Sequence, residues 1–214
     1  MPSRAASAHA AIARNPSRSL GVDESGATTI ECRISTMEPA VYIISGIPGA
    51  GKTTVSHLLA ASFERGVHIE SDSLQKLIIT GGLWPDQEPQ EEAMRQLTLR
   101  AHNACILAIS FFDAGFTPVI DDVVIGSRLD DFLEELRGRP LRFVMLLPRA
   151  EVVRQRDAER PDKHIFDTWG YLDEVVRNTR RVGLWLDTSE MTAEQALELI
   201  KERANEALIL EWGC

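Results

Sequence analysis

The sequence predicts an α/β fold in which helices flank a five-stranded parallel sheet. From residue 40 onward, short apolar runs alternate with longer amphipathic segments, which is the pattern of βαβ units. A glycine-rich segment connects the first apolar run to the first amphipathic segment. The chain has 214 residues, 44% of them apolar, which suffices for one full core plus extensions. No internal repeat or second core is visible, so residues 37–214 are predicted to form one domain.

The predicted strands are short apolar runs that contain β-branched or aromatic residues. They are residues 40–45, 67–70, 117–121, 141–147 and 183–186. The segments between them have helical periodicity, and Thr192 with Gln195 forms a capping box before the last one. The predicted helices are residues 52–64, 72–79, 90–113, 127–137, 150–158, 170–180 and 192–207. Two glycines and two prolines predict a loop at 81–90.

Residues 1–36 are predicted to be a disordered tail, because they contain few large apolar side chains. The stretch 1–22 has three arginines and no acid, which is also the composition of an organelle transit peptide. We interpret the tail as a plain flexible extension. Met37 precedes the first predicted strand, so translation starting there is an alternative.

Composition and charge exclude several classes of protein. Lys+Arg number 23 against 32 Asp+Glu, and the net charge of -9 disfavours a general nucleic-acid-binding surface. The longest apolar stretch, 104–112, is far shorter than the roughly 20 residues that cross a bilayer. Three widely spaced cysteines without a CxxC pair fit a reducing compartment. We therefore expect a cytoplasmic protein, and no pattern in the sequence defines its oligomeric state.

A glycine-rich motif between the first strand and the first helix predicts nucleotide binding. Residues 46–53 fit G-x-x-x-x-G-K-[ST], the P-loop, in the structural context that its mechanism requires. Backbone N–H groups of such a loop surround phosphates, Lys52 reaches the β and γ phosphates, and the Thr53 hydroxyl coordinates Mg²⁺. The predicted nucleotide-binding residues are Gly46, Ile47, Pro48, Gly49, Ala50, Gly51, Lys52, Thr53 and Thr54. The fold class is therefore that of P-loop NTPases, with ATP and Mg²⁺ as cofactors; a chance match in a strand-to-helix turn is the alternative.

Asp72 directly follows the second predicted strand, at the edge of the sheet where doubly wound folds bind ligands. A carboxylate at this place can accept the proton of a hydroxyl group as that group is phosphorylated. Asp72 is therefore our candidate catalytic base. The alternative is that it caps the following helix, which is a common role for aspartate.

Two further acids end the third predicted strand at the same edge. Asp121 is our candidate for holding Mg²⁺ through water, in the manner of a Walker-B aspartate. Asp122 should point to the other face of the strand, and it is the weaker candidate. Paired acids at a strand end can also be ordinary solvated loop residues.

The segment 137–160 is rich in arginine, and two of these arginines share one helix face. Arg156 and Arg160 are four residues apart and lead into the polar segment 161–164, which has the composition of a mobile lid and includes His164. Guanidinium groups there could stabilise the charge on a transferred phosphoryl group. The alternative is a solvated face with local ion pairs. The arginines predicted to lie on the surface are Arg137, Arg139 and Arg142.

Taken together, the order of these motifs resembles the small P-loop kinases of the chloramphenicol phosphotransferase and related AAA-type ATP-binding phosphotransferase group. The resemblance covers most of residues 40–205. The segments that match the family pattern are GIPGAGKTT, ESDSL, VIDDVVIG, the R-x-x-x-R of Arg156 and Arg160, and LDTSEMTAEQAL. It implies an adenylate-kinase-like three-layer sandwich, ATP with magnesium, and Asp72 as the base. It also implies that residues 186–189 border the adenine. The tail and the loop with Trp84 depart from the family pattern.

Three functions are compatible with these residues. The first is transfer of the γ-phosphate of ATP to a hydroxyl of a small molecule. The second is a 5′-hydroxyl polynucleotide kinase, which the acidic charge and the single stacking candidate, Trp84, disfavour. The third is an ATPase or nucleotide switch without an acceptor. A pure switch would not need Asp72 on the acceptor side, although ATPases use similar acids to orient water.

Overall fold

The computed structural model describes residues 38–158 and 172–209. Its sheet consists of β1 (Val41–Ser45), β2 (Gly66–Glu70), β3 (Thr117–Asp121), β4 (Leu141–Leu146) and β5 (Leu184–Leu186). The strands pair in parallel in the order β2-β3-β1-β4-β5. The predicted α/β fold with a five-stranded parallel sheet is thus confirmed. The predicted tail at 1–36 lies outside the described residues.

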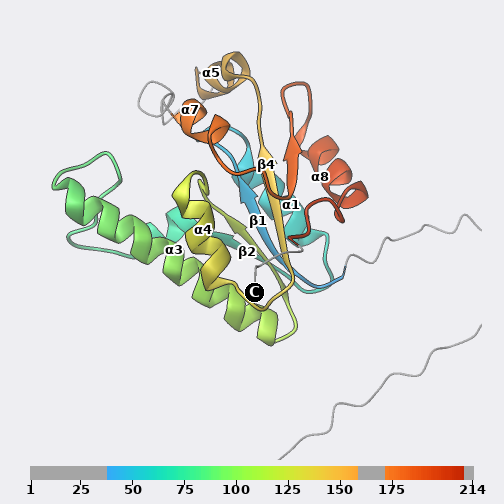
Figure 1. Cartoon of the computed structure of the whole chain (residues 1–214), viewed down its shortest axis with the longest axis horizontal. Coiled ribbons are helices and arrows are strands. Elements are labelled where there is room, and N and C mark those ends of the chain that lie inside the picture. Colours follow the sequence, from blue (N-terminus) through green and yellow to red (C-terminus); the bar gives the residue numbers. More distant parts are fainter. Residues whose placement is uncertain (1–37, 159–171, 210–214) are drawn as a thin grey trace, which may run out of the picture. The chain divides into compact units, whose positions relative to one another are not determined.

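Helices cover both faces of this sheet. They are α1 (Lys52–Ala61), α2 (Ser71–Gln75), α3 (Gln90–Asp113), α4 (Ser127–Glu135), α5 (Ala150–Ala158), α7 (Leu172–Arg177) and α8 (Ala193–Glu202). Helix α1 contacts α8, and α3 contacts α4, and the two pairs lie on opposite sides of the sheet (Figure 1). The result is the expected three-layer sandwich. Within the described segments, every helix is too short or too polar to span a bilayer.

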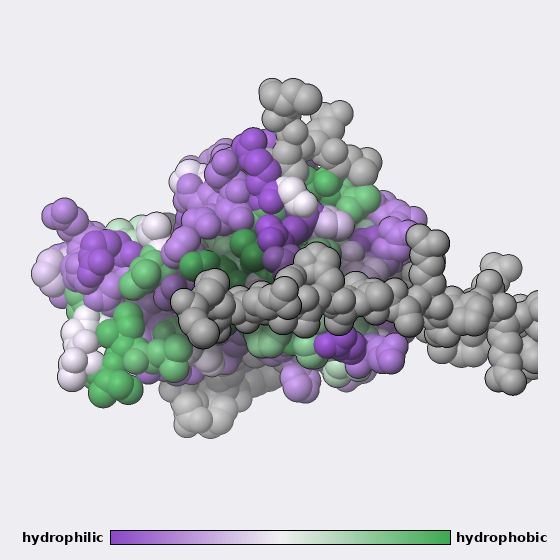
Figure 2. Space-filling view, turned by 90° about the horizontal axis from the view of Figure 1, so that it is seen from below, coloured by the Kyte–Doolittle hydropathy of each residue, from purple (hydrophilic) through white to green (hydrophobic). Residues whose placement is uncertain are grey.

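The core surrounds the central strands. Every residue of β1, β3 and β4 is buried, which is why these strands have few polar residues and no simple alternation of polar and apolar positions. Burial also raises the pKa of the Cys105 thiol on α3 to about 12. On the face in Figure 2, hydrophobic residues form separate groups among hydrophilic ones.

Several predicted helices end earlier than their sequence patterns indicate, and the largest differences are in α2 and α8. Helix α2 ends at Gln75 instead of residue 79, and the apolar side chains of Leu77 and Ile79 beyond it are 72% and 88% exposed. Helix α8 ends at Glu202, and the chain then turns back to pair with β4 through Arg142 and Leu208. The predicted capping box at the start of α8 is confirmed.

Arg142 was predicted to lie on the surface, and this prediction is wrong. It belongs to β4, next to the centre of the sheet, and is only 4% exposed. Its Nε donates to the Ala204 carbonyl at 3.2 Å, and its Nη1 donates to the Glu38 carbonyl at 3.0 Å. The guanidinium also lies over the Tyr42 ring. Arg142 therefore joins β4 to both ends of the domain, whereas Arg137 and Arg139 pair with acids at the surface.

We expect Arg142→Met to lower the free energy of unfolding by about 2 kcal/mol or more, because two carbonyl groups lose a charged donor. Arg137→Met is the matched control. Arg137 is exposed, so its replacement should change this free energy by no more than about 0.5 kcal/mol. Urea unfolding followed by circular dichroism would measure both variants. Equal stability of the two would contradict the structural role assigned to Arg142.

Candidate active site

The loop from β1 to α1 has a backbone that requires glycine. Gly46, Gly49 and Gly51 have φ angles of 150°, 90° and 92°. A Cβ atom on Gly46 would lie 2.7 Å from the Leu146 carbonyl oxygen, and one on Gly49 would lie 2.7 Å from Cγ1 of Val153. The loop is therefore closely packed against β4 and α5. Its glycines give it the compact, inward-turned form that fits a nucleotide phosphate chain.

The first turn of α1 presents the polar residues of this motif. The Lys52 ammonium donates to the Ile47 carbonyl at 3.3 Å, so it lies over the loop. Lys52, Thr53 and Thr54 all line a cavity of about 530 Å³. The α1 N-terminus adds the positive end of its dipole to the Lys52 charge. This side of the cavity therefore favours an anionic ligand.

The cavity lies at the carboxyl ends of β1, β2 and β3, and it also receives residues from α3, α4 and α7. This is the edge at which open parallel sheets bind ligands. Its volume is that of a small-molecule site. The described residues that line it are Pro48, Gly49, Gly51, Lys52, Thr53, Thr54, Glu70, Asp72, Lys76, Trp84, Pro85, Gln90, Met94, Leu97, Arg100, Asp121, Asp122, Val123, Ile125, Arg128, Leu172 and Val175.

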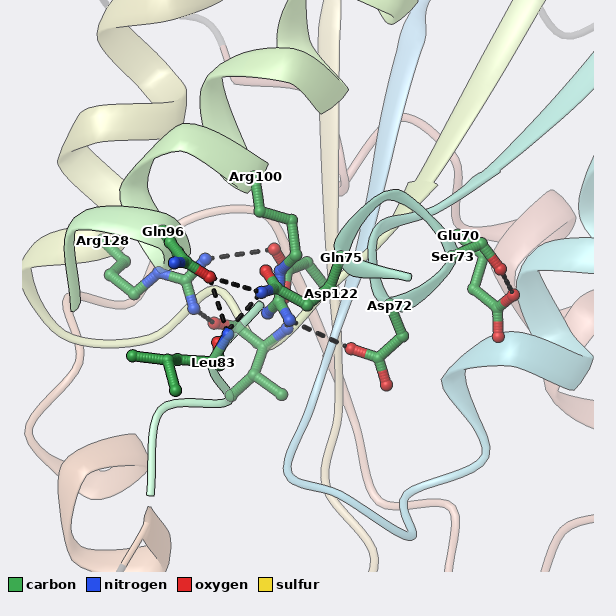
Figure 3. Close-up of polar contacts among 10 residues, drawn as sticks. Glu70, Asp72, Ser73, Gln75, Leu83, Gln96, Arg100, Asp122 and Arg128 are labelled. Carbon is green, nitrogen blue, oxygen red and sulfur yellow. Dashed lines mark hydrogen bonds and ion pairs between the residues drawn. The ribbon is translucent and has the colours of Figure 1, made fainter. Parts of the chain in front are cut away.

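Asp72 lies in the first turn of α2, and its side chain is 49% exposed. Its Oδ1 accepts from Nη1 of Arg100 at 3.2 Å, whereas no described residue donates to Oδ2. The helix begins after Glu70, and the structure shows no side-chain capping hydrogen bond there. One oxygen of Asp72 is thus held in place and the other remains available to a ligand (Figure 3).

The two acids at the end of β3 have different partners. Asp121 is 5% exposed, and its Oδ2 lies 3.0 Å from Nε2 of His68 on β2. Asp122 is 4% exposed and accepts from three donors. Its Oδ1 accepts from Arg100 at 2.9 Å and from the Val123 amide at 2.7 Å, and its Oδ2 accepts from Arg128 at 3.0 Å. Asp122 therefore has more hydrogen-bond donors than Asp121, and Figure 3 shows Asp122 beside Arg100 and Arg128.

Burial of Asp122 opposes its ionisation, but the nearby positive charges and donors outweigh this effect. The guanidinium groups of Arg128 and Arg100, the Val123 amide and the charge of Lys52 together hold the pKa of Asp122 below its ordinary value. Asp122 is therefore ionised at neutral pH.

The sequence patterns did not single out Arg100 and Arg128 as site residues. Arg100 is 6% exposed, and it continues the buried stripe of α3 formed by Leu97, Ala101 and Ala104. A charged residue within an apolar stripe signals a buried ion pair, so the periodicity of α3 could have found it. Arg128 is the second residue of α4 and follows Asp122 by six residues, and no periodic pattern distinguishes it.

An amide network holds the loop that separates α2 from α3. The side-chain oxygen of Gln96 accepts from the Leu83 amide at 2.7 Å and from Gln75 at 3.1 Å. Its side-chain nitrogen donates to the Gly81 carbonyl at 2.8 Å, and Gln75 donates to the Leu83 carbonyl at 2.9 Å. Residues 81–83 are thereby fixed, and the next residue, Trp84, lines the cavity.

Arg156 donates from Nη2 to the carbonyls of Thr188 and Met191, at 3.1 and 3.5 Å. It thus contacts the segment that follows β5. Residues 186–189, predicted to border the adenine, are not among the described residues that line the cavity. Arg160 and the predicted lid at 161–164, with His164, lie outside the described residues.

The described residues contain no group of three acidic, histidine or cysteine side chains that could enclose a metal ion. Thr53 and Asp121 nevertheless line the same cavity. This pair fits Mg²⁺, which is commonly bound by few protein ligands together with water and substrate phosphates.

The chain was compared with known proteins. A family model described as chloramphenicol phosphotransferase-like protein matches residues 39–205. The chain belongs to this family. No curated protein matches it at a significant level.

Solved structures confirm the fold class. A sugar kinase from Janibacter sp. HTCC2649 has a TM-score of 0.56 and 20% identity, covering 79% of this chain and 96% of its own. The tunicamycin resistance protein of Deinococcus radiodurans has a TM-score of 0.56 and 19% identity, covering 80% and 99%. A shikimate kinase from Bacteroides thetaiotaomicron has a TM-score of 0.54 and 16% identity, covering 78% and 98%. At these identities, the similarity shows the fold.

We expect Asp122→Asn to destabilise the protein by about 3 kcal/mol at pH 7, because it removes the negative charge between two arginines. The folded pKa of Asp122 lies below its ordinary value of 3.8, so its contribution to stability is complete above that value and is lost as the pH falls through the folded pKa. The difference in stability between wild type and variant should therefore shrink as the pH is lowered below 3.8. Chemical unfolding across this range would measure it, and a constant difference would contradict the assignment.

Proposed function

We propose that this protein is a kinase that transfers the γ-phosphate of ATP to a hydroxyl group of a small molecule. The observation that carries this proposal is the position of Asp72 in the cavity that Lys52 and Thr53 also line. A carboxylate with one available oxygen faces the same space as a phosphate-binding loop. Family membership supports the same conclusion.

ATP with Mg²⁺ would supply the γ-phosphoryl group for the reaction. The amides of the loop and Lys52 would bind the β and γ phosphates, and Thr53 and Asp121 would hold the metal, Asp121 through water. Arg156 and Arg160 are proposed to stabilise negative charge on the transferred group. For Arg156, this role requires the guanidinium to leave the Thr188 carbonyl that it contacts in this structure.

Asp72 would orient the acceptor hydroxyl and take its proton on Oδ2. The oxygen of the acceptor would form a bond to the γ-phosphorus while the bond from that phosphorus to the β–γ bridging oxygen breaks, which leaves ADP. Arg100 holds Oδ1 of Asp72 at 3.2 Å and thereby limits the rotation of this carboxylate. Such positioning lowers the barrier because the reacting groups are already aligned.

The two alternative functions are less well supported. A polynucleotide kinase needs a basic surface for the strand, but the loop beside the cavity and the first turn of α3 together contain four acids between residues 86 and 92. A switch without an acceptor leaves the available oxygen of Asp72 without a function. Incubation with radiolabelled ATP and a panel of hydroxyl metabolites would test the proposal, since a switch labels none of them.

Lys52→Ala should abolish phosphoryl transfer and weaken nucleotide binding, because it removes the cation that binds the β and γ phosphates. Lys201→Ala on α8, where Lys201 pairs with Glu198, should keep full activity. Transfer would be measured with labelled ATP, and binding would be measured by calorimetry. Wild-type turnover in Lys52→Ala would exclude the phosphotransferase mechanism.

Asp72→Asn should fold normally, bind ATP with Mg²⁺, and lose about two to four orders of magnitude in transfer rate. The lower end is expected, because a dissociative transition state needs little proton removal and part of the loss comes from misplacing the acceptor. Asp131→Asn, an exposed position on α4, is the matched control and should be fully active. A stable Asp72→Asn variant with full transfer would remove Asp72 from the mechanism.

A further inference from the structure

The part of the cavity that Asp72 lines is here called the acceptor side. Arg100 and Arg128 face this side, and one buried acid, Asp122, binds both. Arg100 and Arg128 line the cavity, as Asp122 does. Asp122 accepts from Arg100 through Oδ1 and from Arg128 through Oδ2, and its side chain is only 2% exposed. The proposed mechanism assigns no chemical step to Asp122. A role for Asp122 in choosing the acceptor would explain its place in the cavity, and such a role rests on the proposed function.

The terminal nitrogens of both guanidinium groups are engaged by protein acceptors. Arg100 uses Nη1 for Asp72 and Nη2 for Asp122. Arg128 uses Nη1 for the Val123 carbonyl and Nη2 for Asp122. The two positive charges are balanced by two carboxylates within this cluster, which comprises Asp72, Arg100, Asp122 and Arg128. The cluster presents no net charge to an acceptor.

Among the residues that the structure describes, the remaining charges on this side of the cavity also balance. Lys76 and Glu70 both line it, and they contribute one charge of each sign. An anionic acceptor would need to displace Asp122 from the two arginines, or to lie beside Asp72 and Asp122 at a cost in electrostatic repulsion. Binding of an uncharged alcohol requires no displacement of Asp122 and causes no such repulsion.

Apart from Gln90, the other described residues that line this wall from the loop and from α3 are apolar. Trp84, Pro85, Met94 and Leu97 line the cavity from the loop and from α3. Trp84 contributes a half-buried aromatic side chain to this wall. The wall thus fits an uncharged alcohol that carries an apolar ring or chain.

We propose that Asp122 is a specificity-determining residue that neutralises Arg100 and Arg128, and so makes the site select uncharged alcohols over alcohols that carry a carboxylate or phosphate. Without the charge of Asp122, the same two arginines would form a site for an anion, because a pair of guanidinium forks is well suited to an oxyanion. The selectivity of this pocket therefore depends on one buried carboxylate.

The test uses two probes of equal size that differ in charge, 4-(hydroxymethyl)benzamide and 4-(hydroxymethyl)benzoate. Saturating ADP and Mg²⁺ occupy the phosphate-binding loop, so that the carboxylate cannot bind there. Calorimetry and saturation-transfer NMR measure the dissociation constants. The wild-type protein should bind the benzamide at least about tenfold more tightly than the benzoate. Equal affinity, a preference for the benzoate, or no detectable benzamide binding would overturn the proposal.

Two variants test the role of Asp122 itself. Asp122→Asn leaves the cluster with one excess positive charge, and the preference should shift toward the benzoate by about tenfold or more. The double variant Asp122→Asn with Arg128→Gln restores a neutral cluster and should again prefer the benzamide. A wild-type preference in Asp122→Asn would contradict the proposal. If Asp122→Asn does not fold, the double variant and the wild type still decide it, since a benzoate preference in either is incompatible with charge neutralisation.

Binding is measured without phosphoryl transfer, so the two proposals can fail separately. Selective binding of the benzamide in a protein that phosphorylates no alcohol would remove the kinase function and retain the charge selection. Phosphorylation of alcohols by a protein that binds both probes equally would retain the kinase function and remove the role of Asp122.

Discussion

The buried ion pairs of Asp122 connect the elements that form the cavity. This carboxylate follows β3, and its partners Arg100 and Arg128 come from α3 and α4. Arg100 extends the connection to Asp72 on α2. A buried carboxylate between two guanidinium groups is stable only while all partners remain, because any one left alone would be an uncompensated charge in the interior. The relative positions of α2, α3, α4 and the sheet edge therefore depend on this cluster.

The parallel sheet explains why chemically different groups meet at one cavity. All five strands end at the same edge, so the loop after β1, Asp72 after β2 and Asp121 after β3 converge there. Hydrogen bonds between residues distant in the chain also join the segments near this edge. Ser45 at the end of β1 exchanges two hydrogen bonds with the backbone of Val124, and Thr179 accepts from the amide of Gly126. The phosphate side and the acceptor side are thus built on the same rigid edge.

The acceptor side depends on side chains to a greater degree than the phosphate side. The phosphate side uses backbone geometry, which the glycines make possible. The loop of the acceptor side is held by the amides of Gln75 and Gln96, and these in turn bring Trp84 to the cavity. A change in one such amide would move the apolar wall without affecting the loop that binds phosphate. The same fold can therefore serve different acceptors, and family membership leaves the acceptor undefined.

The sequence alone determined the strands, most helices and the phosphate-binding loop, because these are set by local patterns: periodicity, β-propensity and fixed glycine spacing. It also singled out Asp72 and Asp121, since a polar residue at or just after the carboxyl end of a parallel strand must lie at the sheet edge. Only the tertiary structure decided which partners these acids have, that Asp122 bridges two arginines, and that Arg142 is buried. It also decided that α2 ends at Gln75, before the exposed Leu77 and Ile79. The physical reason is that ion pairing and burial depend on residues distant in the chain, such as the pair Arg100 and Asp122, which no local pattern can relate.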